Sequence, residues 1–274
     1  KNVKDKTINL DLLDGDLIRV YSSDLIDMSN SVKIYGVPMS QACRSLIWLL
    51  LNKKIKFELI LTMPGSKQEN GTRHPSYLEK FPNATIPALE DSDTGFLLSE
   101  SHAIMCYLCN KHEWYDFYPK EIEARAKVDD FLHYHHRKVK EASLAYFAPK
   151  VRTDLNLPEN LIEISRKSFN DSLNALETNW LNKNKFITGD NVTLADLAAY
   201  VEIGQLRDCY TNLYDFKELP NIQRWIEDMT NVDGHDDAHL VLKELGDISV
   251  SPPAMEDIAK ANITGFKKIL ELSS

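Results

Sequence analysis

The segments Ala84-Thr-Ile-Pro-Ala-Leu89 and Gly95-Phe-Leu-Leu-Ser-Glu100 give the clearest indication of the fold. Pro87 has no N–H for a β-ladder, so it belongs at the start of a strand, where the peptide bond before it can be cis. Two short apolar strands are therefore predicted, over residues 88–90 and 96–98. A turn rich in Asp and Gly separates them.

The residues on either side complete a mixed pattern of strands and helices. A helix is expected over residues 100–108, where Glu100 suits the positive end of the helix dipole. Upstream, the sequence predicts strands over residues 32–35 and 56–62 and helices over residues 45–51 and 75–80. The first of these helices is apolar nearly all round, as expected for a helix covered on both sides. The order strand-helix-strand-helix-strand-strand-helix fits a thioredoxin-like sheet.

Only helices are predicted in the second half of the chain. They are expected over residues 121–147, 158–183, 193–213, 219–231 and 254–272. The strongest start signal is Thr193, which can cap a helix while Asp196 returns a bond to the Thr193 backbone. Leu194, Leu197, Ala198 and Val201 then recur at helical spacing, which predicts a core helix.

These patterns divide the chain into four parts. Residues 1–30 form an N-terminal extension of unknown role, with one short candidate strand over residues 16–21. A thioredoxin-like domain is expected over residues 31–112, an all-helical domain over residues 113–250, and a C-terminal helical extension over residues 251–274. The predicted fold class is thus α/β plus all-α.

Composition narrows the function classes. With 274 residues and 43% apolar content, the chain can bury the cores of two domains. Its 32 basic and 41 acidic residues give a net charge of -9, which argues against nucleic acid or an anionic membrane as the main partner. The four cysteines do not form a disulfide framework and no apolar run reaches membrane-spanning length, so we expect a cytoplasmic protein in a reducing compartment.

Four local patterns together resemble the cytosolic glutathione transferases, most closely their serine-type theta and delta classes. They are Ser40-Gln-Ala-Cys-Arg44, Ala84-Thr-Ile-Pro-Ala-Leu89, Leu98-Ser-Glu-Ser-His-Ala-Ile104 and the Thr193 to Asp196 capping box. The resemblance covers residues 32–230 and implies a homodimer that conjugates glutathione to small hydrophobic electrophiles in detoxification. Glutathione-dependent peroxidase activity is a further option. Glutathione would be a co-substrate, and no metal or other cofactor is expected.

Ser40 and Arg44 are the predicted catalytic residues. A free thiol with a pKa near ~8.5 is only a few per cent thiolate at neutral pH, so a transferase must stabilise the sulfur anion. A serine hydroxyl at a helix N-terminus can do so, although Ser40 could also be a plain helix cap. Arg44 either adds positive charge near the thiolate or pairs with an acid between the domains. Cys43 is expected to be a buried helix residue, because Ser40 replaces the first cysteine of a redox Cys-x-x-Cys motif.

The resemblance also implies where the tripeptide binds. Ser101 and its backbone N–H would take the γ-glutamyl carboxylate, Glu100 the amino group, and the backbone of Ile86 the cysteinyl part. Further predicted contacts are Arg73, at the glycyl carboxylate, together with Thr85, Pro87 and His102. Two positions depart from the delta pattern: Ala84 stands in place of a histidine, and His102 in place of a common arginine.

The two histidine groups, His133 to His136 and His235 to His239, are not expected to bind metal. On a helix, His133 and His136 share a face but have no obvious carboxylate partner on it. The helix that carries the first group is expected to line the acceptor pocket or a subunit interface, with Tyr134 as a wall of the pocket. Two non-enzymatic alternatives remain open at this point. The fold also serves as an interaction module, as in translation-factor subunits, and an apolar crevice could store ligands.

Overall fold

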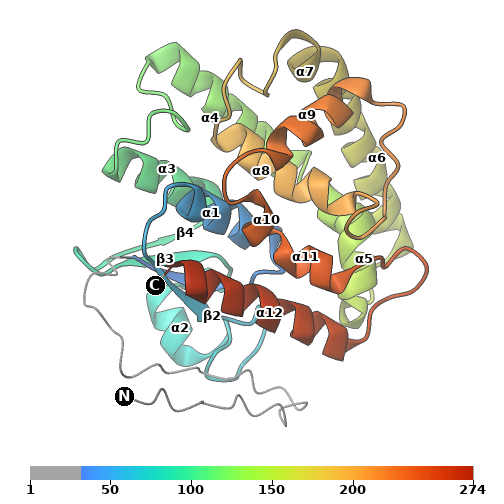
Figure 1. Ribbon diagram of the computed structural model, residues 1–274. Helices are drawn as coiled ribbons and strands as arrows, with labels where there is room; N and C mark the ends of the chain where they lie inside the picture. Colours follow the sequence, from blue (N-terminus) through green and yellow to red (C-terminus); the bar gives the residue numbers. More distant parts are fainter. Residues whose placement is uncertain (1–31, 274) are drawn as a thin grey trace, which may run out of the picture.

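The computed structural model describes residues 32–273, which form a small mixed sheet beside a larger set of helices (Figure 1). The predicted extension over residues 1–30 and its candidate strand over residues 16–21 lie outside the described residues. Within residues 32–273, no helix is both long enough and apolar enough to cross a membrane.

The sheet contains all four predicted strands. They are β1 (Val32–Gly36), β2 (Glu58–Leu61), β3 (Ala88–Asp91) and β4 (Phe96–Ser99), in the order β2-β1-β3-β4. β1 pairs parallel with β2 and antiparallel with β3, and β3 pairs antiparallel with β4. This mixed order confirms the thioredoxin-like prediction.

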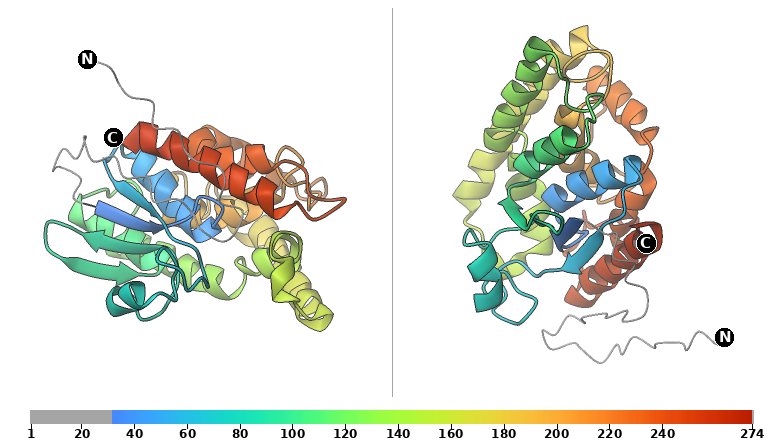
Figure 2. Two further views of the ribbon diagram at one scale, coloured as in Figure 1. Left: turned by 90° about the horizontal axis from the view of Figure 1, so that it is seen from below. Right: turned by 90° about the vertical axis from the view of Figure 1, so that its left-hand side faces the viewer.

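Helices cover both faces of the sheet (Figure 2). α1 (Gln41–Asn52) and α3 (Ser101–Lys111) lie on one face, and the short α2 (Pro75–Lys80) lies on the other. Residues 43–50 of α1 are all buried, as its uniform apolar character predicts. On the opposite face, Tyr77 and Phe81 pack against Tyr35 and Ala88.

The remaining helices all follow α3 in the chain. They are α4 (Ile122–Arg137), α5 (Ala148–Val151), α6 (Glu159–Ala175), α7 (Leu181–Lys183), α8 (Leu194–Ile203), α9 (Pro220–Thr230), α10 (His235–Ala238), α11 (Leu240–Leu245) and α12 (Met255–Ser273). Short π-helical turns occupy Ser143–Phe147 and Leu176–Trp180, and 3-10 turns occupy Thr153–Leu155 and Gly204–Leu206.

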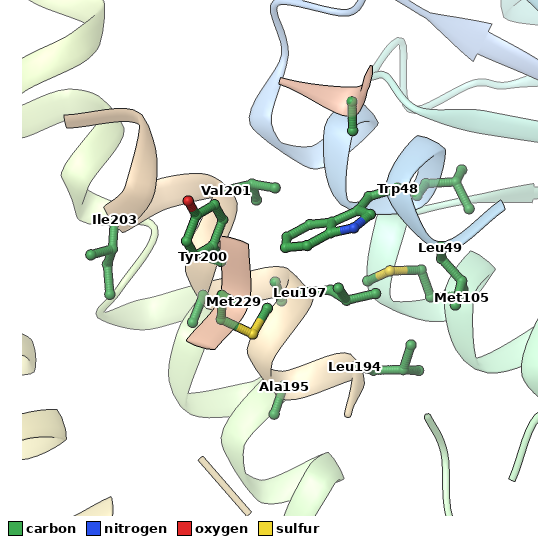
Figure 3. Close-up of a cluster of buried hydrophobic side chains, with 14 of the residues drawn as sticks. Trp48, Leu49, Met105, Leu194, Ala195, Leu197, Tyr200, Val201, Ile203 and Met229 are labelled. Atoms are coloured by element: carbon green, nitrogen blue, oxygen red, sulfur yellow. The ribbon is translucent and has the colours of Figure 1, made fainter. Parts of the chain in front are cut away.

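α8 is the central helix, and every one of its residues is buried. Its predicted capping box is present, because the Thr193 N–H donates to Asp196 Oδ2 at 2.9 Å. Figure 3 shows where its apolar side chains meet the first domain: Trp48 and Met105 lie opposite Leu197 and Leu194. The two domains therefore share one continuous apolar core.

Two predicted helices are shorter than expected, and the short helices α5, α10 and α11 lie outside every predicted range. The helix expected over residues 121–147 ends at Arg137, because Lys138 leaves helical geometry (φ -133°, ψ -69°) and the next residue, Val139, is fully buried. The helix expected over residues 193–213 ends at Leu206, where Thr211 Oγ1 donates to Gln205 O and folds the chain back. The short helices α10 and α11 had no clear start signal in the sequence.

Candidate functional site

A cavity of ≈ 710 Å³ opens between the sheet domain and the helical domain. Its walls come from the segment before β3, the start of α3, one face of α1, and the facing sides of α4 and α8. Six of the predicted site residues line it: Thr85, Ile86, Pro87, Glu100, Ser101 and His102. The structure thus brings together two segments that the sequence separates by more than ten residues.

The start of α3 presents unpaired donors to this cavity. Glu100 is the residue before the helix, with φ +74°, and its exposed side chain makes no capping hydrogen bond. Such a backbone is strained for a residue other than glycine, and strain of this kind gathers at binding sites. The N–H groups of Ser101, His102 and Ala103 have no backbone acceptor within residues 32–273. This helix start therefore suits a carboxylate.

Ile86 also lines this cavity, and the hydrogen-bonding groups of its backbone have no partner in the described part of the chain. Its bond to Pro87 is cis, as expected. Neither the N–H nor the C=O of Ile86 makes a hydrogen bond in the described part of the chain. The preceding Thr85 carbonyl is held by the Tyr77 hydroxyl at 2.6 Å. The Ile86 backbone is thus fixed in place and available to an extended peptide.

Ser40 is the N-cap of α1, and its side chain is half-buried. Its Oγ accepts a long hydrogen bond of 3.5 Å from the Cys43 N–H, which leaves the hydroxyl able to donate elsewhere. Cys43 itself is fully buried, and burial raises the pKa of its thiol to about 11. Cys43 is therefore a buried helix residue, as predicted. Ser40 does not line the cavity, although Ala42 and Ser45 of the same helix do.

Arg44 points into the domain interface. It is fully buried, and its guanidinium donates to Met39 O at 2.6 Å, to Val201 O at 3.1 Å and to Gln205 Oε1 at 2.9 Å. Burial lowers its pKa to about 10, against the raising effect of the Glu202 carboxyl. Of the two roles considered for Arg44, these contacts favour the link between domains. Its hydrogen-bond partners are carbonyl and amide oxygens, whereas that alternative had named an acid.

Arg73 also lies outside the lining of the cavity. Its side chain is exposed, and its backbone N–H donates to Ser66 O at 2.8 Å within the loop after β2. Its assignment to the glycyl carboxylate therefore stays a prediction.

The cavity lining also includes Glu202 and His135, which sequence reasoning did not single out as site residues, and His135 lies beside the predicted His102. Glu202 is only 3% exposed, and its Oε2 has no hydrogen-bond partner among the described residues. Burial raises its pKa to about 8. The rings of His102 and His135 meet at 4.8 Å, and burial lowers the pKa of His102 to about 4. The signal in the sequence was Glu202, a carboxyl group among apolar residues in the last turn of α8.

The two histidine groups take different places. His133 and His136 line the cavity, whereas Tyr134 is not among its lining residues and packs on Trp180 with ring centroids 4.8 Å apart, so its role as a pocket wall stays a prediction. His235 Nε2 lies 2.7 Å from the Tyr200 hydroxyl, inside the aromatic core. Over residues 32–273, no three His, Cys, Asp or Glu residues are grouped in a way that could hold a metal ion.

The comparisons with known proteins all indicate one family. Residues 34–116 match the family described as Glutathione S-transferase, N-terminal domain, and residues 138–233 match Glutathione S-transferase, C-terminal domain. Glutathione S-transferase theta-1 of Homo sapiens is 27% identical over 235 residues, which are 82% of this chain and 94% of the relative. The theta-1 enzyme of Gallus gallus is 30% identical over 206 residues, which are 71% of this chain and 76% of the relative.

Solved structures with a similar fold are glutathione transferases as well. Human glutathione S-transferase T1-1 in its apo form has a TM-score of 0.66 at 25% identity, and the match covers 87% of this chain and 99% of the other. A delta-class glutathione transferase of Nilaparvata lugens has a TM-score of 0.64 at 26% identity, over 89% of this chain and 100% of the other. With both family domains in order and a relative that is 30% identical over 71% of this chain, the chain belongs to the glutathione S-transferase family.

Proposed function

We propose that this protein conjugates the thiolate of glutathione to electrophilic carbon atoms of small hydrophobic acceptors, and that Ser40 stabilises the thiolate. Transferase activity follows from the two family domains and from relatives named glutathione S-transferase. One observation supports the roles of individual residues: the uncapped start of α3 and the free backbone of Ile86 line the same cavity.

The tripeptide is proposed to bind along these two segments. Its γ-glutamyl carboxylate accepts hydrogen bonds from Ser101 and from the free amides at the start of α3, and its ammonium group pairs with the Glu100 carboxylate. The cysteinyl part pairs with the Ile86 backbone, as an added strand pairs with a sheet edge. This binding mode uses donors and acceptors that have no partner within the described chain.

Ser40 is then the group that acts on the sulfur. A hydroxyl that donates to the thiolate lowers the thiol pKa, and the N-terminal end of α1 adds a favourable dipole. The sulfur lone pair attacks the electrophilic carbon, an S–C bond forms, and the leaving group departs with its electron pair. The thiol proton goes to solvent. The hydroxyl thus stabilises the anion that attacks more than the neutral thiol that binds.

Further properties of the family are proposed for this chain as well. A homodimer fits the exposed apolar side chains on β4, where Phe96 is 43% exposed and Leu97 is 37% exposed. A cytoplasmic location, peroxidase activity and the absence of nucleic-acid partners stay predictions. Static light scattering at micromolar concentration tests the dimer, which should have twice the chain mass of 31.3 kDa.

The experiment that tests the function measures binding and turnover together. The protein is passed over immobilised glutathione and assayed with glutathione and an activated aryl halide such as chlorodinitrobenzene. We expect retention on the column and formation of the aryl thioether. Retention without turnover would favour a ligand carrier, and loss of both would favour a non-catalytic interaction module.

A further inference from the structure

The turn over residues 37–40 joins β1 to α1 and presents Ser40. The Ser40 N–H donates to Val37 O at 3.1 Å, which closes the turn. Met39, directly before Ser40, is only 7% exposed, so its backbone polar groups need partners within the protein. Those partners decide where the Ser40 hydroxyl lies.

Both backbone groups of Met39 are held by side chains. Its C=O accepts from Arg44 Nη1 at 2.6 Å, and its N–H donates to Asn262 Oδ1 at 3.0 Å. Asn262 lies on α12, which is separated from Met39 by 223 residues of chain. Figure 1 shows α12 running beside β2 and α11, both of which it contacts.

The orientation of Asn262 is fixed at both ends of its amide. Its Nδ2 donates to Ile258 O at 3.2 Å, one turn back on α12, and only an oxygen can accept the Met39 N–H. The side chain is 8% exposed, so water does not easily replace it. The Asn262 amide therefore links α12 to the turn in one fixed orientation.

α12 also comes close to the turn through its backbone. Gly265 lies one turn after Asn262, and a Cβ at this position would be 3.2 Å from Cβ of Pro38 and 3.1 Å from Cβ of Val241. Those distances are shorter than ordinary contacts, so the glycine permits the approach. The hydrogen bond of Asn262 and the close packing at Gly265 thus act on neighbouring residues of the same turn.

We propose that Asn262 is a positioning residue for Ser40, and that the docked helix α12 is part of the thiolate-stabilising site. This inference rests on the proposed role of Ser40. Without an acceptor, the buried Met39 N–H is left unpaired, and the turn shifts to reach water or another carbonyl. A hydroxyl displaced by a fraction of an ångström from the sulfur forms a weaker hydrogen bond, and hydrogen bonds to an anion depend strongly on geometry.

The main test substitutes Asn262→Leu, which keeps the side-chain size and removes the acceptor. The thiol of bound glutathione is titrated by the ultraviolet absorbance of the thiolate, and kcat and KM are measured with an aryl halide. We expect the titration midpoint to rise by about 0.5 to 1 unit and kcat to fall roughly fivefold. The affinity for glutathione should stay within about threefold, because the γ-glutamyl site is untouched. An unchanged midpoint and kcat would overturn the proposal.

Two further variants separate positioning from a general loss of structure. Asn262→Gln keeps a neutral amide that can accept from Met39 and donate to Ile258, and should recover part of the shift in the midpoint. Ile269→Val removes one buried methyl group of α12 about two helical turns beyond Asn262, in a different hydrophobic cluster from Met39, so it should lower the melting temperature and leave the midpoint unchanged. If Ile269→Val or Asn262→Gln shifts the midpoint as much as Asn262→Leu does, the specific role of the amide is refuted.

A double-mutant cycle with Ser40→Ala shows whether Asn262 acts through the serine. In the Ser40→Ala background, Asn262→Leu should have no further effect on kcat, because the group that it positions is gone. A full fivefold loss in that background would refute the inference. If Ser40→Ala alone leaves the midpoint unchanged, the proposed function of Ser40 fails first, and this result is distinct from a failure of Asn262 alone. Should Asn262→Leu not fold, Asn262→Ala gives the same comparison.

Discussion

Nη2 of Arg44 donates a hydrogen bond of 2.9 Å to Oε1 of Gln205, so one fully buried guanidinium joins the first helix of the sheet domain to the 3-10 turn that follows the central helix α8. The same guanidinium binds the carbonyls of Met39 and Val201. Four structural parts thus meet at Arg44: the turn before Ser40, α1, α8 and the 3-10 turn after it. Because α8 belongs to the helical domain, this contact helps to fix the relative position of the two domains.

Arg44→Met should therefore destabilise the protein by about 3 kcal/mol, because it leaves buried carbonyl oxygens and the Gln205 amide without their donor. Urea denaturation measures the free energy of unfolding. Arg166→Met is the control, since Arg166 is exposed and its ion pair with Glu159 at 3.4 Å contributes little. Similar stability of the two variants would show that Arg44 does not hold the domains together.

Ser40→Ala tests the catalytic hydroxyl. We expect the thiol pKa of bound glutathione to rise by about 2 units, which corresponds to roughly 2.7 kcal/mol of lost stabilisation of the anion. Turnover should fall sharply while affinity stays within a few-fold, because the hydroxyl acts on the thiolate that forms. Thiolate absorbance against pH is the measurement. If the variant keeps the low midpoint and full activity, Ser40 is only a helix cap.

Glu100 combines a ligand role with backbone strain, so two variants at one position separate the two effects. Glu100→Gly relieves the positive φ of +74° and should stabilise the fold by about 0.5 to 1 kcal/mol, whereas Glu100→Ala should not. Both should weaken glutathione binding strongly, because the tripeptide ammonium loses its partner. Calorimetry and thermal denaturation give the two readouts. A Glu100→Gly protein that binds normally would exclude the proposed ammonium contact.

Ser101→Ala should weaken the binding of the γ-glutamyl carboxylate of glutathione. The hydroxyl at the start of α3 is proposed to donate to the γ-glutamyl carboxylate, and hydrogen bonds to charged groups contribute about 1.5 to 3 kcal/mol. Calorimetric titration with glutathione should show an affinity lower by at least roughly tenfold. Ser76→Ala, at the start of α2 and outside the cavity lining, is a matched control. Equal affinities for the two variants would place the carboxylate elsewhere.

Local patterns predicted the four strands, the capping box at Thr193 and the burial of α1, because each depends on residues close together in the sequence. The contact from Met39 to Asn262 could not be predicted in this way, because it crosses 223 residues and involves a single amide on an amphipathic helix. The partners of Arg44 were missed for a related reason. Backbone carbonyls are present at every residue, so a sequence cannot show which of them a buried arginine meets.

His135 makes the protein sensitive to acid. Its ring is 4% exposed, neither ring nitrogen makes a hydrogen bond within residues 32–273, and burial holds its pKa well below 6.5. The unfolded chain therefore binds a proton below pH 6.5 while the folded chain does not. The stability from this group is complete above pH 6.5 and falls as the pH decreases, by up to about 1.4 kcal/mol per pH unit.

His135→Phe should remove this dependence and lose no hydrogen bond. The melting temperature of the variant should decline less than that of the unmodified protein between about pH 6.5 and pH 5. His133→Phe is the control, because His133 is exposed on the same helix. Parallel pH profiles for His135→Phe and the unmodified protein would show that other groups cause the acid sensitivity.

Glu202 should have the opposite pH dependence. Its carboxyl is 3% exposed, and burial raises its pKa from 4.5 to about 8, although the charges of Lys140 and Arg44 act to lower it. The folded chain therefore holds a proton that the unfolded chain has released. The stability from this group is complete below about pH 4.5 and is lost as the pH rises toward 8.

Glutamine has the same shape and no charge to lose, so Glu202→Gln should stabilise the protein by about 2 kcal/mol at neutral pH and by little at pH 4.5. Urea denaturation at the two pH values measures the difference. Glu141→Gln is a partly exposed control that should be neutral at both. If Glu202→Gln destabilises the protein at neutral pH, the carboxylate is charged in the folded state and its pairing with Lys140 outweighs desolvation. Glu202 would then place a negative charge in the cavity lining, and the cavity would bind acceptors with cationic groups in preference to neutral ones.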